Sequence, residues 1–414
     1  MQYFFPDSQD LVDPSFDFHT ERRGITRLRQ RDDCYPHEIF ARPPYDGLLI
    51  SRAIVDERYT LAQKQRLLRL GARQFLRIEK KELSHLKVMG DCGAFSYKDA
   101  DVPPFSVDDV IDFYERCGID LGISIDHIIF AFDVAFDREK EVPQGLRDRQ
   151  QLTLEYASDF FEKCHRKQVR FEPVGVAQGW SPQSYAKAVS ELQKIGFTYI
   201  AMGGMVPMKT PDILATLAAV KPVLNPSTRL HLLGVTRCEN FTAFRDFGVV
   251  SFDSTSPLLQ AFKSDTDNYH TPADPYIALR VPQVEGNAKL KAAILSGKVK
   301  QEVARKFEQD CLRSLAALDR GEGDPEQILD LLIGFDELHA GTGKPSKHRE
   351  AYRRVLTDMP WKKCRCEICA ALGVHVILFR GAERNRRRGF HNLYVFYRKV
   401  RKLTNRDKCE PVLA

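Results

Sequence analysis

Short apolar segments alternate with helical segments from residue 47 to residue 253, and this rhythm is the feature that most limits the fold. The apolar segments have the length of single strands, whereas the segments between them carry apolar residues at helical spacing. Seven strands are expected, over residues 47–55, 86–91, 127–133, 171–178, 199–204, 230–234 and 249–253. Because such alternation builds parallel sheets, the sequence predicts an α/β protein with a closed (β/α)8 barrel, the TIM barrel.

The barrel is expected to occupy residues 46–340. Residues 1–45 mix aromatic and basic side chains without a clear period, which predicts an N-terminal extension. Residues 289–338 are charged and helical in pattern, with no strand signal, and are expected to form a helical insertion. Residues 341–414 carry a cysteine cluster and a basic segment, which predicts a C-terminal zinc-binding subdomain ending in a basic helix.

Three cysteines stand within six positions, at Cys364, Cys366 and Cys369. Thiolates and imidazoles are the usual ligands of structural zinc, which takes four of them in a tetrahedron. His391, at the start of an amphipathic helical stretch, is the preferred fourth ligand, and His375 in an apolar segment is the alternative. The pattern predicts one structural Zn²⁺ per chain, with no open position for catalysis.

The distribution of charged residues along the chain, rather than the net charge, predicts a polyanionic partner. The net charge of +6 in 414 residues is too small to identify a partner. Between residues 379 and 407, however, the segment is rich in arginine and lysine, and its only acidic residues are Glu383 and Asp407. A block this one-sided predicts a nucleic-acid-binding surface. The residues expected to bind nucleic acid are Arg380, Arg386, Arg387 and Arg388.

The cysteine usage and the hydropathy predict the cellular setting. Ten cysteines are scattered through a long chain, and no charged and then apolar leader precedes them. This pattern favours a reducing cytoplasm. No apolar run approaches the length of a membrane span, so no membrane association is expected.

Candidate catalytic residues stand where the expected strands end, because the reacting groups of a barrel collect at the carboxyl ends of its strands. Asp91, Asp133 and Asp253 each close an expected strand. A single aspartate in such a place more often caps the following helix. Two opposed carboxylates, however, can carry out glycosidic chemistry, in which one attacks the anomeric carbon and the other transfers a proton.

A series of short motifs resembles the tRNA-guanine transglycosylases in both content and order. The motifs are Asp91–Phe95, Val176–Gly179, Gly203–Met205, Leu233–Val235, Phe252–Ser254, the three cysteines, Leu378–Gly381 and His391–Tyr394. The resemblance spans most of the chain. It implies a (β/α)8 barrel with a zinc subdomain that exchanges guanine in a nucleic acid for a 7-deazaguanine base.

The same resemblance implies a role for individual residues. Asp253 is expected to be the nucleophile that forms a covalent glycosyl intermediate, and Asp91 the general acid and base. The residues expected to bind the purine or to line its pocket are Asp133, Gln178, Gly203, Gly204, Met205 and Leu233. Cys364, Cys366, Cys369 and His391 match the zinc ligands.

Two departures from the tRNA enzymes bear on the substrate. This chain has Cys92, Ala94 and Ser96 where those enzymes commonly have serine, glycine and glutamine, and Pro257–Leu259 where bacterial members have an arginine that contacts RNA. The N-terminal segment, from Phe5 to Glu38, instead resembles the DNA-modifying branch of the family, the DpdA proteins.

That branch implies insertion of 7-cyano-7-deazaguanine (preQ0) into DNA, with a companion ATPase as partner. A homodimer is a further expectation. The alternatives are a tRNA enzyme of queuosine or archaeosine biosynthesis and an inactive nucleic-acid-binding paralogue. Retention of both Asp91 and Asp253 argues against the inactive paralogue.

Overall fold

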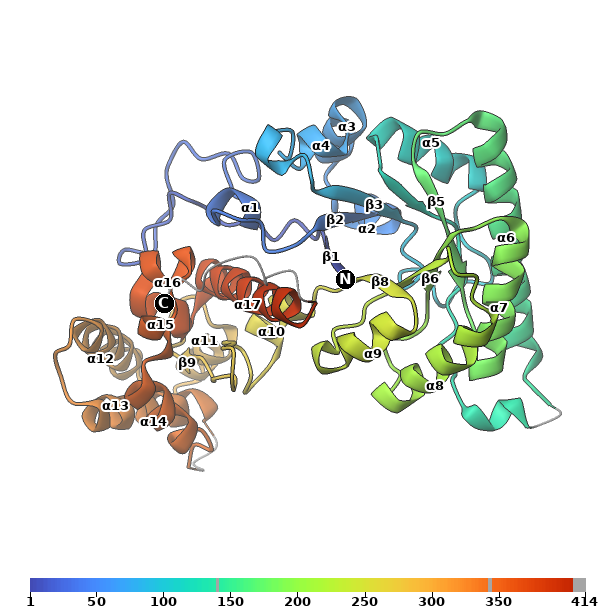
Figure 1. The fold of residues 1–414 in the computed structure, drawn as a ribbon. Helices are drawn as coiled ribbons and strands as arrows, with labels where there is room; N and C mark the ends of the chain where they lie inside the picture. Colours follow the sequence, from blue (N-terminus) through green and yellow to red (C-terminus); the bar gives the residue numbers. More distant parts are fainter. Residues whose placement is uncertain (139–140, 342–344, 405–414) are drawn as a thin grey trace. The chain divides into compact units, whose positions relative to one another are not determined.

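The computed structural model describes residues 1–138, 141–341 and 345–404 of the chain (Figure 1). These residues form two compact units. The first unit contains residues 1–8, 45–255 and 400–404, and the second contains residues 9–44 and 256–399, apart from the gaps at 139–140 and 342–344. The expected boundary near residue 45 lies at one of these divisions, whereas residues 256–340, expected in the barrel, belong to the second unit.

The first unit is a closed barrel of eight parallel strands, as the sequence predicts. The strand order follows the chain, and β8 closes the barrel by pairing with β1, where Phe4 lies opposite Asp253. The strands are β1 (Gln2–Pro6), β2 (Gly47–Ser51), β3 (Lys87–Asp91), β4 (Leu121–Ile123), β5 (Glu172–Ala177), β6 (Tyr199–Met202), β7 (Arg229–Leu232) and β8 (Val249–Asp253).

Helices follow the strands in the pattern of a (β/α)8 barrel. They are α2 (Arg52–Arg58), α3 (Leu61–Leu70), α4 (Ala72–Phe75), α5 (Val107–Cys117), α6 (Gln144–Lys167), α7 (Pro182–Ile195), α8 (Thr210–Val220) and α9 (Phe241–Asp246). Several begin at a polar cap, since the first backbone N–H groups of a helix need an acceptor. The hydroxyl of Ser106, for example, accepts from the backbone N–H of Asp109 at 3.2 Å and starts α5.

The barrel interior is filled by side chains from alternating strand positions. The buried cluster consists of Phe4, Leu49, Met89, Leu121, Ile123, Val174, Val176, Tyr199 and Ala201. On the outside of β3, Gly90 lets α5 approach closely, because a Cβ atom there would lie 2.5 Å from the ring of Tyr114. The tight contact fixes the strand immediately before Asp91.

Two strand assignments from the sequence require correction. Residues 127–133 contain no strand, and the fourth strand is the three-residue segment Leu121–Ile123. The first strand, Gln2–Pro6, lies inside the segment expected to be an extension. Neither strand alternates between apolar and polar residues, since the three central residues of β1 are all buried, and β4 has only three residues, one of them glycine. Residues 127–133 instead supply an apolar run of irregular backbone, in which Ile128 and Ile129 are buried.

The second unit is mainly helical, with a two-stranded parallel sheet of β9 (Leu279–Arg280) and β10 (Leu378–Phe379). Its helices are α1 (Pro36–Ile39), α10 (Ser256–Lys263), α11 (Ala288–Leu295), α12 (Gln301–Asp319), α13 (Pro325–Ala340), α14 (Arg349–Asp358), α15 (Pro360–Lys363), α16 (Glu367–Leu372) and α17 (Gly381–Leu403), of which α17 belongs to the unit through Lys399. The expected helical insertion corresponds to α11–α13, which group with the cysteine cluster rather than with the barrel.

The C-terminal basic helix is α17, as far as Leu403. Arg406 and Asp407, counted in the basic block, lie outside the described residues. None of the helices in the described parts of the chain combines the length and apolar character that a bilayer crossing needs.

Candidate active site and metal centre

Three carboxyl groups gather at the carboxyl ends of the barrel strands. Asp91 ends β3, Asp253 ends β8 and Asp126 lies three residues beyond β4. The pKa of Asp91 is raised to about 8, first by burial and then by the negative charges of Asp126 and Asp253. Backbone N–H groups of Gly93 and Cys92 oppose this shift. At neutral pH, Asp91 is therefore mainly protonated and can donate a proton.

Asp253 is held by two donors on one of its oxygens. Its Oδ1 accepts from the backbone N–H of Gly234 at 3.0 Å and lies 3.2 Å from Nε2 of His231. Gly234 has a φ of +73°, which favours glycine, and so turns its N–H toward the carboxylate. Among the described residues none donates to Oδ2, and the side chain is 12% exposed. One carboxylate oxygen is thus fixed while the other is left for a ligand.

The turn that follows Asp253 is also anchored. Tyr3 on β1 donates its hydroxyl to the backbone carbonyl of Ser254 at 2.6 Å. Burial raises the pKa of Tyr3 well above its usual range, and the charge of Asp253 adds to the shift. The tyrosine therefore stays protonated and remains a donor.

Asp126 and Gln178 form a buried pair. The Nε2 of Gln178 donates to Oδ2 of Asp126 at 2.6 Å, and its Oε1 accepts from the backbone N–H of Ile129 at 3.1 Å. These two bonds fix the orientation of the Gln178 amide. Burial raises the pKa of Asp126 to about 6, although the hydrogen bond from Gln178 opposes the shift. Asp126 is therefore mainly ionised at neutral pH and offers an acceptor to a ligand.

Gly203 and Gly204 lie against this pair, after β6. A Cβ atom on Gly203 would fall 2.2 Å from Nε2 of Gln178. One on Gly204 would fall 2.4 Å from the carbonyl oxygen of Ile129, and Gly204 has a φ of +72°. Both positions require glycine if Gln178 is to keep its place. Met205 is fully buried beyond them.

Leu233, the other expected pocket residue, directly follows β7. Its backbone N–H donates to the carbonyl of Met202 at 3.2 Å. The side chain is partly buried and packs against the barrel core. Leu233 therefore stands one residue before Gly234, the glycine that holds Asp253.

Asp133 does not join this group, which differs from the expectation. It is exposed and caps a short 3-10 helix, Val134–Asp137, by accepting from the backbone N–H of Ala135 at 2.8 Å. The difference follows from the position of the fourth strand. Asp126, for which the sequence carried no signal, lies near the end of that strand, Leu121–Ile123, and is a candidate site residue.

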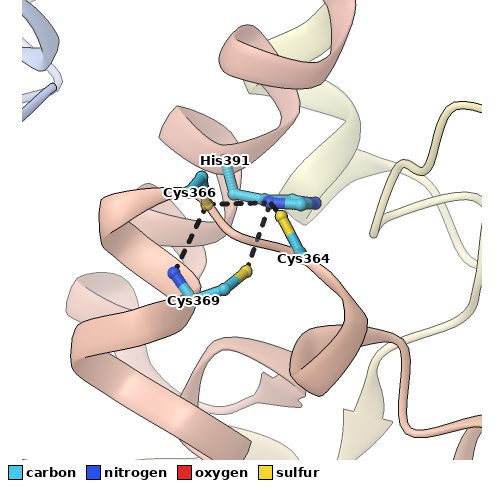
Figure 2. Close-up of side chains that lie close together, drawn as sticks. All are labelled: Cys364, Cys366, Cys369 and His391. Atoms are coloured by element: carbon cyan, nitrogen blue, oxygen red, sulfur yellow. Dashed lines mark hydrogen bonds between the residues drawn. The ribbon is translucent and has the colours of Figure 1, made fainter. Parts of the chain in front are cut away.

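The four predicted zinc ligands come together in the second unit (Figure 2). Their ligand atoms all lie within 4.8 Å of one another. The Nδ1 of His391 lies 3.6, 3.5 and 3.3 Å from the Sγ atoms of Cys364, Cys366 and Cys369, respectively. Tetrahedral zinc, with bonds of about 2.3 Å to sulfur and about 2.0 Å to nitrogen, separates such atoms by about 3.5 Å. The four residues can therefore hold one metal ion.

Neighbouring groups orient the metal-binding histidine. Nε2 of His391 lies 2.8 Å from the carbonyl oxygen of His270 and donates to it, which leaves the Nδ1 lone pair for a metal. Tyr269 stacks on the His391 ring at 4.1 Å. His375, the alternative ligand, is not in the cluster and lies instead beside Arg384, at 3.4 Å.

The basic block between residues 379 and 407 also differs from the expectation of an exposed nucleic-acid-binding surface. Arg380, Arg387 and Arg388, on or just before α17, are buried. Arg380 forms an ion pair with Glu21 at 2.6 Å. Arg388 donates to backbone carbonyl groups, including that of Leu378 at 2.8 Å, and burial lowers its pKa to about 9.

Arg387 and Arg386 are the other two arginines that were expected to bind nucleic acid. Arg387 pairs with Glu383 at 2.6 Å and donates to the carbonyl oxygen of Asp13. Arg386 keeps 24% of its side chain exposed and lies 3.6 Å from Asp10. Three of the four arginines thus bind groups of their own unit and do not offer a surface to phosphate.

Comparison with known proteins identifies the family to which this barrel and its metal centre belong. The family model of queuine tRNA-ribosyltransferase, the tRNA-guanine transglycosylases, matches residues 94–302. A DNA-guanine transglycosylase of Salmonella montevideo is 47% identical over 408 residues, which cover 97% of this chain and 96% of the relative. The chain belongs to the guanine transglycosylase family. It is accordingly an enzyme, a pentosyltransferase that acts on guanine.

Relatives that act on tRNA share a shorter region with this guanine transglycosylase. A tRNA-guanine(15) transglycosylase of Methanosarcina mazei is 26% identical over 204 residues, 47% of this chain and 39% of the relative. The corresponding enzyme of Methanosarcina acetivorans is 27% identical over 179 residues, 42% of this chain and 34% of the relative.

Proposed function

We propose that this enzyme exchanges guanine in DNA for a 7-deazaguanine base, 7-cyano-7-deazaguanine (preQ0), by double displacement. The observation that carries the proposal is the contrast between two carboxyl groups at one end of the barrel. Oδ1 of Asp253 accepts from two N–H groups, whereas Oδ2 has no donor among the described residues, and Asp91 keeps its proton because its pKa is raised. Asp253 is the nucleophile and Asp91 is the acid and base.

The base is bound by Asp126 in place of Asp133. Guanine presents N1–H and a 2-amino group side by side, and an ionised carboxylate is their natural acceptor. Gln178 supports this carboxylate at 2.6 Å, and Gly203 and Gly204 leave room for a flat ring. A 7-deazaguanine keeps both donors, since it differs from guanine at position 7. One site can therefore release guanine and accept the replacement base.

DNA is the favoured substrate. The relative that carries DNA in its name matches 97% of this chain at 47% identity, whereas the tRNA relatives match less than half of it. A duplex buries the bond that must be cut, so the enzyme has to extrude the nucleotide or act on opened DNA. A companion ATPase and a homodimer remain predictions, as does a cytoplasmic location.

The metal centre is proposed to hold structural Zn²⁺. Three thiolates and an imidazole are the donors that zinc prefers, and they leave no open position. Cys364, Cys366, Cys369 and His391 would hold the ion, which would thereby connect the loop that contains Cys364 with α16 and α17. Its role is to stabilise the second unit.

Base exchange with labelled guanine, in DNA and in tRNA side by side, tests the proposed function. We expect incorporation of label into DNA and competition by preQ0. Incorporation into tRNA alone would establish the alternative, a tRNA enzyme. No incorporation into either substrate, by folded protein, would favour the inactive paralogue.

A further inference from the structure

A line of buried polar side chains runs across the inside of the barrel and ends at Asp253. Tyr199 on β6, His231 on β7 and Ser251 on β8 are each no more than 1% exposed. The hydroxyl groups of Tyr199 and Ser251 are hydrogen-bonded. Ser251 Oγ lies 2.7 Å from Nδ1 of His231, whose Nε2 lies 3.2 Å from Oδ1 of Asp253.

When the His231 ring is neutral, the chemistry of the end group fixes the directions of the hydrogen bonds in this line. A carboxylate can only accept, so Nε2 of His231 carries a proton and donates it to Asp253. In the neutral ring Nδ1 is then an acceptor, and the hydroxyl of Ser251 donates to it. The Ser251 oxygen in turn accepts from Tyr199. Burial raises the pKa of Tyr199, which therefore keeps the proton that it donates.

We propose that His231 is a positioning residue for the nucleophile. With the N–H of Gly234, its Nε2–H holds Oδ1 of Asp253, so that Oδ2 is the oxygen that attacks the sugar. Ser251 and Tyr199 hold His231 in the required tautomer. This inference rests on the proposed function, and it adds to it the oxygen that reacts and the group that selects it.

Base exchange takes place in two half-reactions, and His231 should affect the balance between them. In the first, the lone pair of Oδ2 forms a bond to C1′ of the deoxyribose, the bond from C1′ to N9 breaks with its electron pair going to guanine, and Asp91 gives the departing base a proton. In the second, the incoming base loses a proton to Asp91 and attacks C1′ through N9. The bond between C1′ and Oδ2 then breaks, and its electron pair returns to Asp253.

Hydrogen bonds to Oδ1 stabilise the charged carboxylate more than the neutral ester of the intermediate, because bonds to charged groups are stronger. Loss of the His231 donor should therefore shift the balance toward the covalent intermediate. It should also slow the second half-reaction, in which the carboxylate leaves. A residue that only filled space would not change this balance.

Three substitutions of His231 separate the donor from the bulk of the ring. His231→Leu removes all polarity. His231→Asn places its amide near the position of Nδ1, within reach of Ser251 but not of Asp253. His231→Gln extends an N–H to the position of Nε2 and restores the donor to Asp253. Thr216→Val is the matched control, since it removes a buried hydroxyl of α8 that donates to the carbonyl oxygen of Asp212 in the same helix.

The experiment measures turnover in base exchange and the fraction of enzyme trapped as a denaturant-resistant DNA adduct, with melting temperature as a check on folding. In His231→Leu and His231→Asn we expect turnover to fall about tenfold while the ratio of adduct to free enzyme rises about tenfold. His231→Gln and Thr216→Val should stay near the wild type in both quantities.

An adduct ratio that is unchanged or lower in folded His231→Leu would overturn the inference, as would equal behaviour of the Asn and Gln variants. The wild type, assayed in parallel, separates this result from failure of the proposed function. A wild type with neither exchange nor adduct would refute the proposed function itself.

Discussion

Gln178 donates its side-chain amide to Asp126 over 2.6 Å, and this pair is the one that we propose as the purine site instead of Asp133. Asp126→Asn should lower base exchange by about 10- to 100-fold, because guanine loses a charged acceptor. Asp133→Asn is the matched control and should stay near wild type, since Asp133 caps an exposed turn. Steady-state exchange of labelled guanine measures both variants. Equal losses in the two variants, or a larger loss in Asp133→Asn, would restore the assignment made from the sequence.

The rate of exchange should depend on pH in a bell shape. Asp126, with a pKa of about 6, must lose its proton to accept from guanine, so activity should rise as the pH passes 6. Asp91, with a pKa of about 8, must keep its proton to act as the acid, so activity should fall as the pH passes 8. A pH profile of single-turnover exchange, with Asp91→Asn for comparison, measures both limbs. An alkaline limb that persists in Asp91→Asn would show that another group is responsible.

The metal centre should control the stability of the protein. Cys366→Ser should lower the bound zinc below one per chain and the melting temperature by about 5 °C or more, because a thiolate, one of the four ligands, is lost. Cys34→Ser, a cysteine outside the cluster, should keep the zinc. Elemental analysis and thermal unfolding measure the two effects. Protein purified without chelators that contains no zinc would refute the assignment.

The buried arginines should affect stability rather than binding. Arg388→Ala removes the donor to the backbone carbonyl oxygens of Val376, Leu378 and Ala261 and should lower the free energy of unfolding by about 3 kcal/mol. The salt dependence of DNA affinity should not change, because Arg388 is fully buried. Urea unfolding and binding at several salt concentrations measure these quantities. Unchanged stability with a flatter salt dependence would place Arg388 in the DNA interface after all.

Features with a local signal could be predicted from the sequence. The three cysteines and His391 are recognisable because zinc ligands follow fixed spacings, and Asp91 and Asp253 because their strands are regular. Asp126 could not be found, since it follows a strand of only three residues. The buried polar residues His231 and Ser251 stand in apolar strand sequences, where only the register of the barrel shows that they meet.

The basic block shows a different limit. Counting charges along α17 finds the arginines but not their partners. Glu21, which pairs with Arg380 and Arg384, is far away in the sequence, so the local excess of positive charge suggested a free surface. Distant acids that neutralise a basic helix become visible only when the chain is folded.

The most direct test of Asp253 as the nucleophile is to trap the covalent intermediate between enzyme and DNA and to map the residue to which the DNA is attached. Enzyme incubated with guanine-containing DNA and then denatured should carry DNA on the peptide that contains Asp253, as identified by mass spectrometry after digestion. Asp253→Asn should give no adduct, because a neutral amide is a poor nucleophile, whereas Asp91→Asn should form one more slowly. An adduct that persists in Asp253→Asn, or that maps to Asp91, would contradict the account.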